Sequence, residues 1–262
     1  MPLPAILEVD GVSKHFGALA AVDELSFEVQ EGEVFGIAGP NGAGKTALFD
    51  VITGESRASG GKIRFRGREI QDLKANSICR LGIARTFQIP AIFPSQTVLG
   101  TIILAAHFGK HRPLRGASRY SRDEFDLALE AAELVELTGD LGRPADSLTQ
   151  FELKRLMIAA ALATSPAMFM LDEPVGGLTE KEAEKVVGYV QKVKARGITI
   201  LIIEHVMRVL MGISERVLIM NQGKRICQGV PAEVVRDPEV IRVYLGKTVA
   251  AALTAEAEGA HA

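Results

Sequence analysis

The sequence predicts an α/β protein with a parallel-sheet core, an antiparallel β region near the N-terminus and a helical insert. Three nearly continuous apolar runs, VFGIA, AMFML and ITILIIE, are typical of strands covered on both faces of a parallel sheet. Three others, ILEVDGVSKHFG, ELSFEVQEG and GKIRFRGREI, alternate apolar and polar residues, which indicates antiparallel strands. Strand signals stop between Phe93 and Pro166, so we expect the helical insert there.

Two segments of this insert are typical of amphipathic helices, EFDLALEAAELVEL and FELKRLMIAAALA. The second starts after Thr149, a good N-cap residue, and Glu152 follows three positions later, so we predict a capping box. The local basic run at 107–122 is predicted to be a solvated loop, with contact to lipid headgroups or a membrane-embedded partner as the alternative.

Beyond the insert, EKEAEKVVGYVQKVKARG predicts a helix with Gly197 just past its end. SERVLIMNQGKRICQG then predicts a hairpin that turns at Asn221-Gln222-Gly223. The expected division is a core formed by 1–91 and 166–246, a helical subdomain at 92–165 and a disordered tail at 247–262.

Composition narrows the possible functions. A chain of 262 residues with 47% hydrophobic content can form a core without disulfide or metal support. Thirty Lys and Arg against 32 Asp and Glu give a net charge of -2, so nucleic acid is not an expected partner. Cys79 and Cys227 lack metal-site spacing and suit a reducing compartment. No run approaches the roughly 18 apolar residues of a membrane span, so we expect a cytosolic protein that reaches a membrane through partners.

A phosphate-binding loop is indicated between the strand VFGIA and the helix TALFDVITG. Glycines allow backbone N–H groups to surround phosphate oxygens at a helix N-terminus, the lysine adds a positive charge, and the following hydroxyl can bind Mg²⁺. This motif predicts ATP and Mg²⁺ as ligands, whereas a glycine-rich turn without a ligand is the alternative. The predicted ligand-binding residues are Gly39, Pro40, Asn41, Gly42, Ala43, Gly44, Lys45, Thr46 and Ala47.

A pair of acids ends the second apolar strand. Asp172 is placed to hold Mg²⁺ through water, and Glu173 to act as the general base that activates the attacking water. The alternative is a strand that ends in solvated acids, which the phosphate-binding loop in the same chain disfavours.

From about Leu7 to Gly246 the chain resembles the ATP-binding subunit of ABC transporters, which implies a RecA-like P-loop core and ATP hydrolysis. The resemblance implies that Gln88, in IARTFQIP, contacts Mg²⁺ and the attacking water, that His205, in ILIIEHVM, is a catalytic switch, and that Phe16, in SKHFG, stacks on adenine. Taken alone, Gln88 would be an ordinary loop residue, His205 a structural histidine and Phe16 a core residue.

Several longer stretches, including GIARTFQ, IIEHVMRVLMGISERVLIMNQGK and DPEVIRVYLG, are similar to importer ATPases for branched-chain amino acids. FDVITG, FQIPAIF, DEPVGGLT and VIRVYLG also resemble the urea and short-chain amide branch. The resemblance implies a pair of ATPases, usually two different ones although a homodimer is an alternative, on two permease subunits. It also implies a peripheral location on the cytoplasmic face of the inner membrane and an extracytoplasmic solute-binding protein as an indirect partner.

The chain departs from the family at the signature helix, where LSGGQ or LSYGQ is expected and 148–152 read LTQFE. By resemblance, Thr149 retains the hydroxyl that meets a partner's nucleotide. Phe151 should crowd that approach, and Glu152 should repel it by on the order of 4 kcal/mol at about 4 Å before screening. Ala47 loses one hydrogen bond of roughly 1 kcal/mol.

These departures predict either an asymmetric ATPase pair, in which SLTQFE completes the weaker site, or a branch that tolerates the change. A regulatory subunit that binds nucleotide with little hydrolysis, and a non-transport ATPase of the same fold, are the competing functions.

Overall fold

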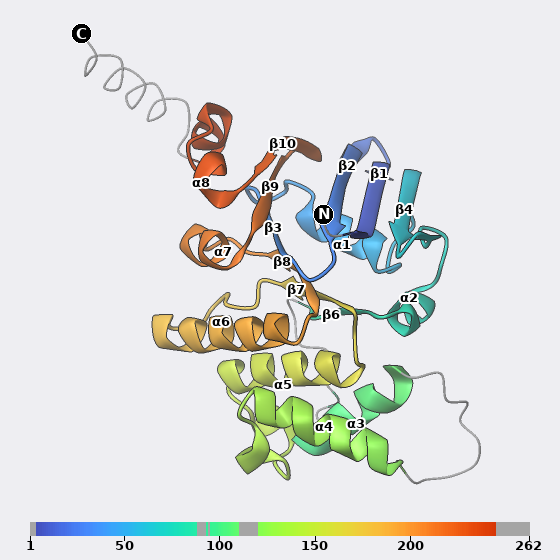
Figure 1. The fold of residues 1–262 in the computed structure, drawn as a ribbon, viewed down its shortest axis with the longest axis vertical. Coiled ribbons are helices and arrows are strands. Elements are labelled where there is room, and N and C mark those ends of the chain that lie inside the picture. Colours follow the sequence, from blue (N-terminus) through green and yellow to red (C-terminus); the bar gives the residue numbers. More distant parts are fainter. Residues whose placement is uncertain (1–3, 88–92, 94, 110–119, 245–262) are drawn as a thin grey trace.

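The computed structural model describes residues 4–87, 93, 95–109 and 120–244. An antiparallel sheet of order β2-β1-β4-β5 lies at the upper right of Figure 1. It contains β1 (Ala5–Phe16), β2 (Leu19–Gln30), β4 (Gly60–Phe65) and β5 (Arg68–Glu69). Alternating burial along β2 matches the alternating sequence, so the predicted antiparallel β region is confirmed.

A six-stranded sheet of order β10-β9-β3-β8-β7-β6 forms the centre of the fold. Its strands are β3 (Val34–Ala38), β6 (Ile83–Arg85), β7 (Met168–Asp172), β8 (Thr199–Ile203), β9 (Arg216–Asn221) and β10 (Lys224–Gly229). All neighbours are parallel except β9 and β10, and every residue of β3, β7 and β8 is buried. The predicted parallel core is therefore confirmed, as is the hairpin, whose Gln222 and Gly223 have φ of 48° and 79°.

Helices cover this sheet and extend away from it. Five of them accompany the strands, namely α1 (Lys45–Ile52), α2 (Ala75–Leu81), α6 (Glu180–Ala195), α7 (Met207–Ile213) and α8 (Pro231–Val234). Helices α3 (Val98–Gly109), α4 (Arg122–Leu134) and α5 (Gln150–Ala163) pack on one another at the bottom of Figure 1. Short 3-10 turns at Thr138–Asp140 and Ala145–Ser147 connect α4 to α5.

Each face of the six-stranded sheet contributes to a separate core. Ile200 and Ile202 of β8 belong to the core formed with α3 to α6, whereas Leu201 and Ile203 belong to the core formed with α1 and the antiparallel sheet. The subdomain boundaries at 91/92 and 165/166 stay a prediction, and the predicted tail at 247–262 lies outside the described residues. Among the described helices, none is long and apolar enough to cross a membrane.

Three helices begin with the same capping box. In each, a hydroxyl accepts a hydrogen bond from the N–H of a glutamate, and that glutamate's carboxylate accepts one from the cap residue's own N–H. The cap residues are Ser121 for α4, Thr149 for α5 and Thr179 for α6, so the predicted box at Thr149 is confirmed.

Candidate functional site

The loop at 39–44 joins β3 to α1 and is held tightly between two other strands. A Cβ atom at Gly39 would lie 2.2 Å from the Met220 carbonyl oxygen, and one at Gly44 would lie 1.9 Å from the Ala21 carbonyl oxygen. Gly44 also has φ of 99°, a conformation that side chains disfavour, and it is the N-cap of α1. The glycines therefore allow both the backbone path and the close approach of β2 and β9.

Lys45 points back into this loop. Its side chain is buried, and Nζ donates hydrogen bonds to the carbonyl oxygens of Gly39 at 2.8 Å and Pro40 at 3.0 Å. Burial lowers the pKa of Lys45, while the carboxylates of Glu173 and Asp172 oppose that shift. An ammonium group beside the N-terminal N–H groups of α1 suits an anion with several oxygens, such as a phosphate.

Asp172 ends β7 next to a buried arginine. Its Oδ2 accepts a hydrogen bond from Nη2 of Arg85 at 2.9 Å, whereas Oδ1 is buried and has no hydrogen-bond partner among the described residues. Burial raises the pKa of Asp172, and Arg85 counteracts this effect. An unpartnered carboxylate oxygen is a suitable ligand for a hard divalent cation.

The described residues contain no group of three or more His, Cys, Asp and Glu side chains that could hold a metal ion. Asp172 would therefore share the ion with the exposed Thr46 hydroxyl, water and substrate oxygens. Mg²⁺ accepts such sites because it keeps several waters and binds substrate phosphates. The residues fit Mg²⁺ as an ion that arrives with the nucleotide.

Glu173 and His205 meet where two adjacent parallel strands end. Glu173 follows β7 and His205 lies just beyond β8, and Nε2 of His205 is 2.5 Å from Oε1 of Glu173. Glu173 has φ of 49°, a strained value that its backbone contacts maintain. Its N–H donates to the Ile203 carbonyl at 2.9 Å, and its own carbonyl accepts from Nζ of Lys154 at 2.7 Å. A carboxylate beside an imidazole can accept and hold a proton there.

Glu204 supports this pair and was not singled out in the sequence. Its carboxylate is buried and accepts hydrogen bonds from the N–H groups of Val175 at 2.8 Å and His205 at 3.1 Å. Burial raises the pKa of Glu204. Glu204 therefore ties the chain after Glu173 to the backbone of His205; an acid at the end of an apolar strand, in ILIIEHV, is the signal that could have indicated it.

The start of α5 differs from the sequence-based expectation in the charge of Glu152. Glu152 does not present an unbalanced charge, because its Oε1 lies 2.7 Å from Nη1 of Arg143, which holds the pKa of Glu152 at about 2. The Phe151 ring is half-buried and lies against the cations of Arg155 and Lys185, with centroid distances of 5.3 Å and 5.8 Å. The predicted repulsion by an unbalanced Glu152 charge is corrected accordingly, whereas the predicted crowding by Phe151 stays a prediction.

Two other predicted site residues have different outcomes. Phe16 ends β1 with 54% of its surface exposed, so the alternative of a core residue is wrong and its ring is accessible for stacking. Gln88 lies outside the described residues. Within the loop, Asn41, Gly42 and Thr46 are exposed, Pro40, Gly44 and Ala47 are half-buried, and Gly39, Ala43 and Lys45 are buried.

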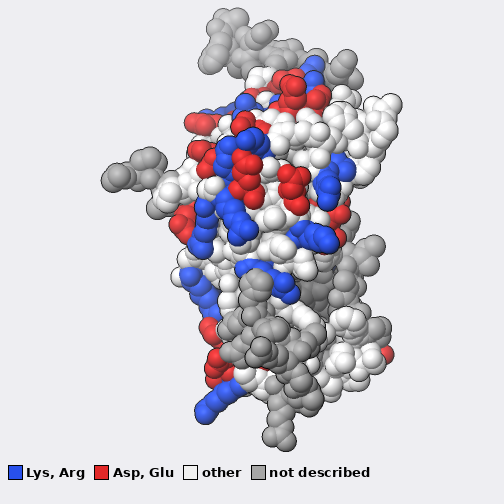
Figure 2. Space-filling model, turned by 90° about the vertical axis from the view of Figure 1, so that its right-hand side faces the viewer, with Lys and Arg blue, Asp and Glu red and all other residues white. Residues whose placement is uncertain are grey.

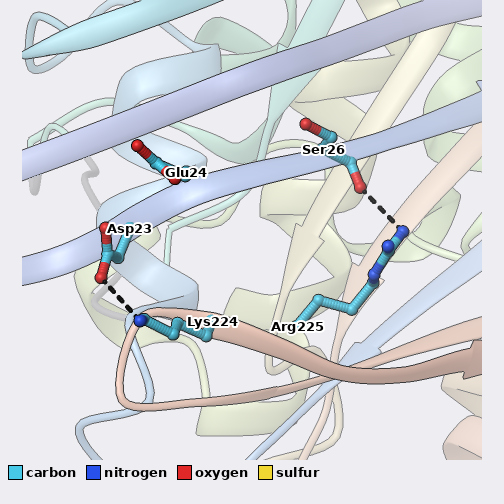
Figure 3. A pocket seen from close by; sticks show the side chains of 5 residues that line it. All are labelled: Asp23, Glu24, Ser26, Lys224 and Arg225. Carbon is cyan, nitrogen blue, oxygen red and sulfur yellow. Dashed lines mark hydrogen bonds and ion pairs between the residues drawn. The ribbon is translucent and has the colours of Figure 1, made fainter.

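A separate concavity of about 310 Å³ lies between β2 and β10 (Figure 3). Its cations already have protein partners, since Lys224 lies 3.3 Å from Asp23 and Nη1 of Arg225 donates to the Ser26 carbonyl at 3.2 Å. Figure 2 likewise shows acidic and basic side chains interspersed over one face of the molecule. We therefore assign no ligand to the concavity.

Comparison with known proteins agrees with this geometry. A family model described as ABC transporter matches residues 22–176, and one described as branched-chain amino acid ATP-binding cassette transporter matches residues 224–250. The chain therefore belongs to the ATP-binding cassette family of ABC transporters and is an ATP hydrolase of that type. The resemblance inferred from the motifs is confirmed.

Within that family, particular relatives are similar along most of the chain. It is 36% identical to the high-affinity branched-chain amino acid transport ATP-binding protein BraF of Pseudomonas aeruginosa, and 37% identical to the corresponding protein LivG of Salmonella typhimurium. Each alignment covers 92% of this chain and 98% of the relative. Among solved structures, the ADP conformation of the cassette MJ1267 has a TM-score of 0.84 and 31% identity, covering 93% of this chain and 100% of that one.

Proposed function

We propose that this chain powers the import of branched-chain amino acids by binding ATP at 39–46 and hydrolysing it with Glu173 and His205. The observation that carries the catalytic part is the 2.5 Å contact between these two side chains, at the same sheet edge as the loop that holds Lys45. The names and similarity of the relatives support the choice of cargo.

In the proposed reaction, water attacks the γ-phosphorus of ATP and the bond to the bridging β-γ oxygen breaks, which releases ADP and phosphate. Lys45 and the backbone N–H groups at the start of α1 bind phosphate oxygens and orient the γ-phosphoryl group. Glu173 accepts the proton of the attacking water, and His205 holds the glutamate in place through their short contact. Phe16 stacks on the adenine.

Mg²⁺ is the proposed cofactor, and it would neutralise charge on the phosphate oxygens. Thr46 and Asp172 would hold it from the two sides of the site, with Gln88 as a further proposed ligand. The buried, unpartnered Oδ1 of Asp172 supports this assignment.

The proposed assembly is a pair of cassettes on two permease subunits, with a second, different ATPase as the expected partner. In it, Thr149 at the start of α5 meets the nucleotide held by the partner cassette. The ion pair of Glu152 with Arg143 and the position of Phe151 favour a usable signature helix over a degenerate one. An asymmetric pair would then require a cause other than the charge of Glu152.

A pocket of about 250 Å³ between α2 and β6 is the proposed contact for a permease subunit. Phe87, with 40% of its surface exposed, lines it together with Thr53, Asn76 and Cys79. An exposed aromatic ring beside polar groups is typical of protein interfaces. Through this contact the chain would sit peripherally on the cytoplasmic face of the inner membrane, and a solute-binding protein would deliver cargo from the other side.

The test is reconstitution of the chain with its partner ATPase and permeases in vesicles. We expect MgATP-dependent uptake of labelled leucine, and loss of both uptake and hydrolysis in Lys45→Ala. Lys62→Ala, at an exposed lysine of β4, is the matched control. Uptake that stays at the unmodified level in Lys45→Ala would overturn the site, while uptake of labelled urea in place of leucine would overturn the cargo alone.

A second experiment in the same vesicles tests whether the two ATPases of the pair contribute equally to turnover. Glu173→Gln in this chain and the equivalent change in the partner should reduce turnover to a similar extent if both sites are used. A much smaller loss of turnover from one of the two changes would instead support the hypothesis of an asymmetric ATPase pair.

A further inference from the structure

Arg85 is a buried cation that connects the phosphate-loop helix to the acidic end of β7. Its side chain is only 6% exposed. Nη1 donates to Oδ1 of Asp50 at 2.6 Å, and Nη2 donates to Oδ2 of Asp172 at 2.9 Å. The guanidinium also lies over the rings of Phe49 and Phe87, with centroid distances of 5.4 Å and 5.0 Å. Each terminal nitrogen therefore has a different carboxylate partner, and aromatic rings limit the motion of the group.

This arrangement determines which oxygen of Asp172 remains for another ligand. Arg85 occupies Oδ2, and Oδ1 is left buried without a hydrogen-bond partner among the described residues. The rigid plane of a guanidinium restricts the rotation of a carboxylate more than the single ammonium of a lysine does. Arg85 thus holds Asp172 with one defined oxygen available.

The second contact acts on the other side of the same site. Asp50 belongs to α1, whose first turn contains Lys45 and Thr46. Arg85 lies at the end of β6 and binds both Asp50 and Asp172. It therefore fixes the position of α1 relative to the end of β7. Those are the two elements that carry Thr46 and Asp172.

We propose that Arg85 is a positioning residue for Mg²⁺, which presents Oδ1 of Asp172 to the ion and holds α1, with Thr46, against β7. This inference rests on the proposed nucleotide site and adds the residue that aligns its two metal ligands. Replacing a residue that hydrogen-bonds to a metal ligand and orients it typically lowers metal affinity by about 10- to 100-fold.

The test measures how Mg²⁺ changes the binding of ADP to the full chain, without requiring hydrolysis. Calorimetric titration gives the dissociation constant of ADP in EDTA and at a series of Mg²⁺ concentrations. The Mg²⁺ midpoint is the Mg²⁺ concentration at which half of the Mg²⁺-dependent change in ADP affinity has occurred. For Arg85→Met we expect ADP binding in EDTA within about twofold of the unmodified chain, and a Mg²⁺ midpoint raised about tenfold or more. Arg85→Lys should shift the midpoint less, because it keeps the charge but cannot reach both carboxylates in the same way.

Controls separate positioning from general support of the fold. Arg80→Met, at an exposed arginine of α2, should match the unmodified chain. If Arg85→Met does not fold, Asp50→Asn and Arg85→Lys test the positioning role in its place, and both should raise the Mg²⁺ midpoint. A lower melting temperature with an unchanged or lowered Mg²⁺ midpoint in the folded variants would overturn the proposal. Failure of the unmodified chain to bind ADP would instead overturn the proposed nucleotide site.

Discussion

Thr149→Ala removes one of three matched helix caps, so its effect on stability and its effect on turnover can be separated. The hydroxyl oxygens of Ser121, Thr149 and Thr179 lie 3.4 Å, 3.3 Å and 3.4 Å from the N–H nitrogens that they cap. These are long hydrogen bonds, so alanine at each position should cost about 1 kcal/mol, within the usual range for N-caps. For a domain of this size that corresponds to a melting temperature lower by about 2–4 °C.

Thermal unfolding of Thr149→Ala and Ser121→Ala, followed by circular dichroism, should therefore give similar shifts, whereas Thr179→Ala should give at least as large a shift because the Thr179 hydroxyl also donates to Oε2 of Glu182 at 2.7 Å. MgATP turnover in the assembled complex should fall about tenfold only in Thr149→Ala, because a hydrogen bond to a charged phosphate contributes about 1.5–3 kcal/mol. Ser121→Ala, on α4, is the matched control, and Thr149→Ser should restore both properties. Unchanged turnover in Thr149→Ala, or an equal loss in Ser121→Ala, would refute the contact of Thr149 with the partner's nucleotide.

Three further predictions concern the site and its loop. Glu173→Gln, combined with the equivalent change in the partner ATPase, should retain ATP binding but lower turnover by about 10²- to 10⁴-fold, measured by phosphate release, and a loss of less than about tenfold would contradict the base role. The pKa of Glu152, about 2, lies below its ordinary value of 4.5, so its charge stabilises the fold fully above about pH 4.5 and loses that effect as the pH falls toward 2. The difference in melting temperature between the unmodified chain and Glu152→Gln should shrink over that interval, and a constant difference would argue against the ion pair. Gly44→Ala should destabilise the chain far more than Gly42→Ala in denaturant titrations, because a Cβ would meet the Ala21 carbonyl at 1.9 Å in the first case and open space in the second.

Local patterns were sufficient to predict the sheets and the phosphate loop. The strands β3, β7 and β8 are continuous apolar runs, and the loop motif depends on residues that are adjacent in sequence. Helix α3 was not predicted as an element because VLGTIILAAHFG is apolar nearly throughout, which leaves no clear periodicity. Such a run does not distinguish a buried helix from a buried strand.

Contacts between residues far apart in the sequence explain the features of the site that were not predicted. Arg85 and its partner Asp172 are 87 positions apart, so their contact depends on β6 and β7 being neighbours in the sheet. Glu152 was correctly placed in a capping box, but its charge was misjudged because Arg143 approaches it through the turns before α5. Pairing of charges across the fold cannot be predicted from the spacing of one motif.

The tight fit of the phosphate loop has a mechanical consequence. The N–H of Gly223 donates to the Ala43 carbonyl, and the Gly223 carbonyl accepts from the N–H of Asp23, both at 3.0 Å. The loop, the β9-β10 turn and β2 thus form one chain of backbone hydrogen bonds that runs from the central sheet into the antiparallel sheet. A bound phosphate that accepts hydrogen bonds from the loop's N–H groups would pull directly on this chain of backbone hydrogen bonds. Occupancy of the site should then make the connection between the two sheets more rigid, and hydrogen exchange at the amides of Asp23 and Gly223 should become slower.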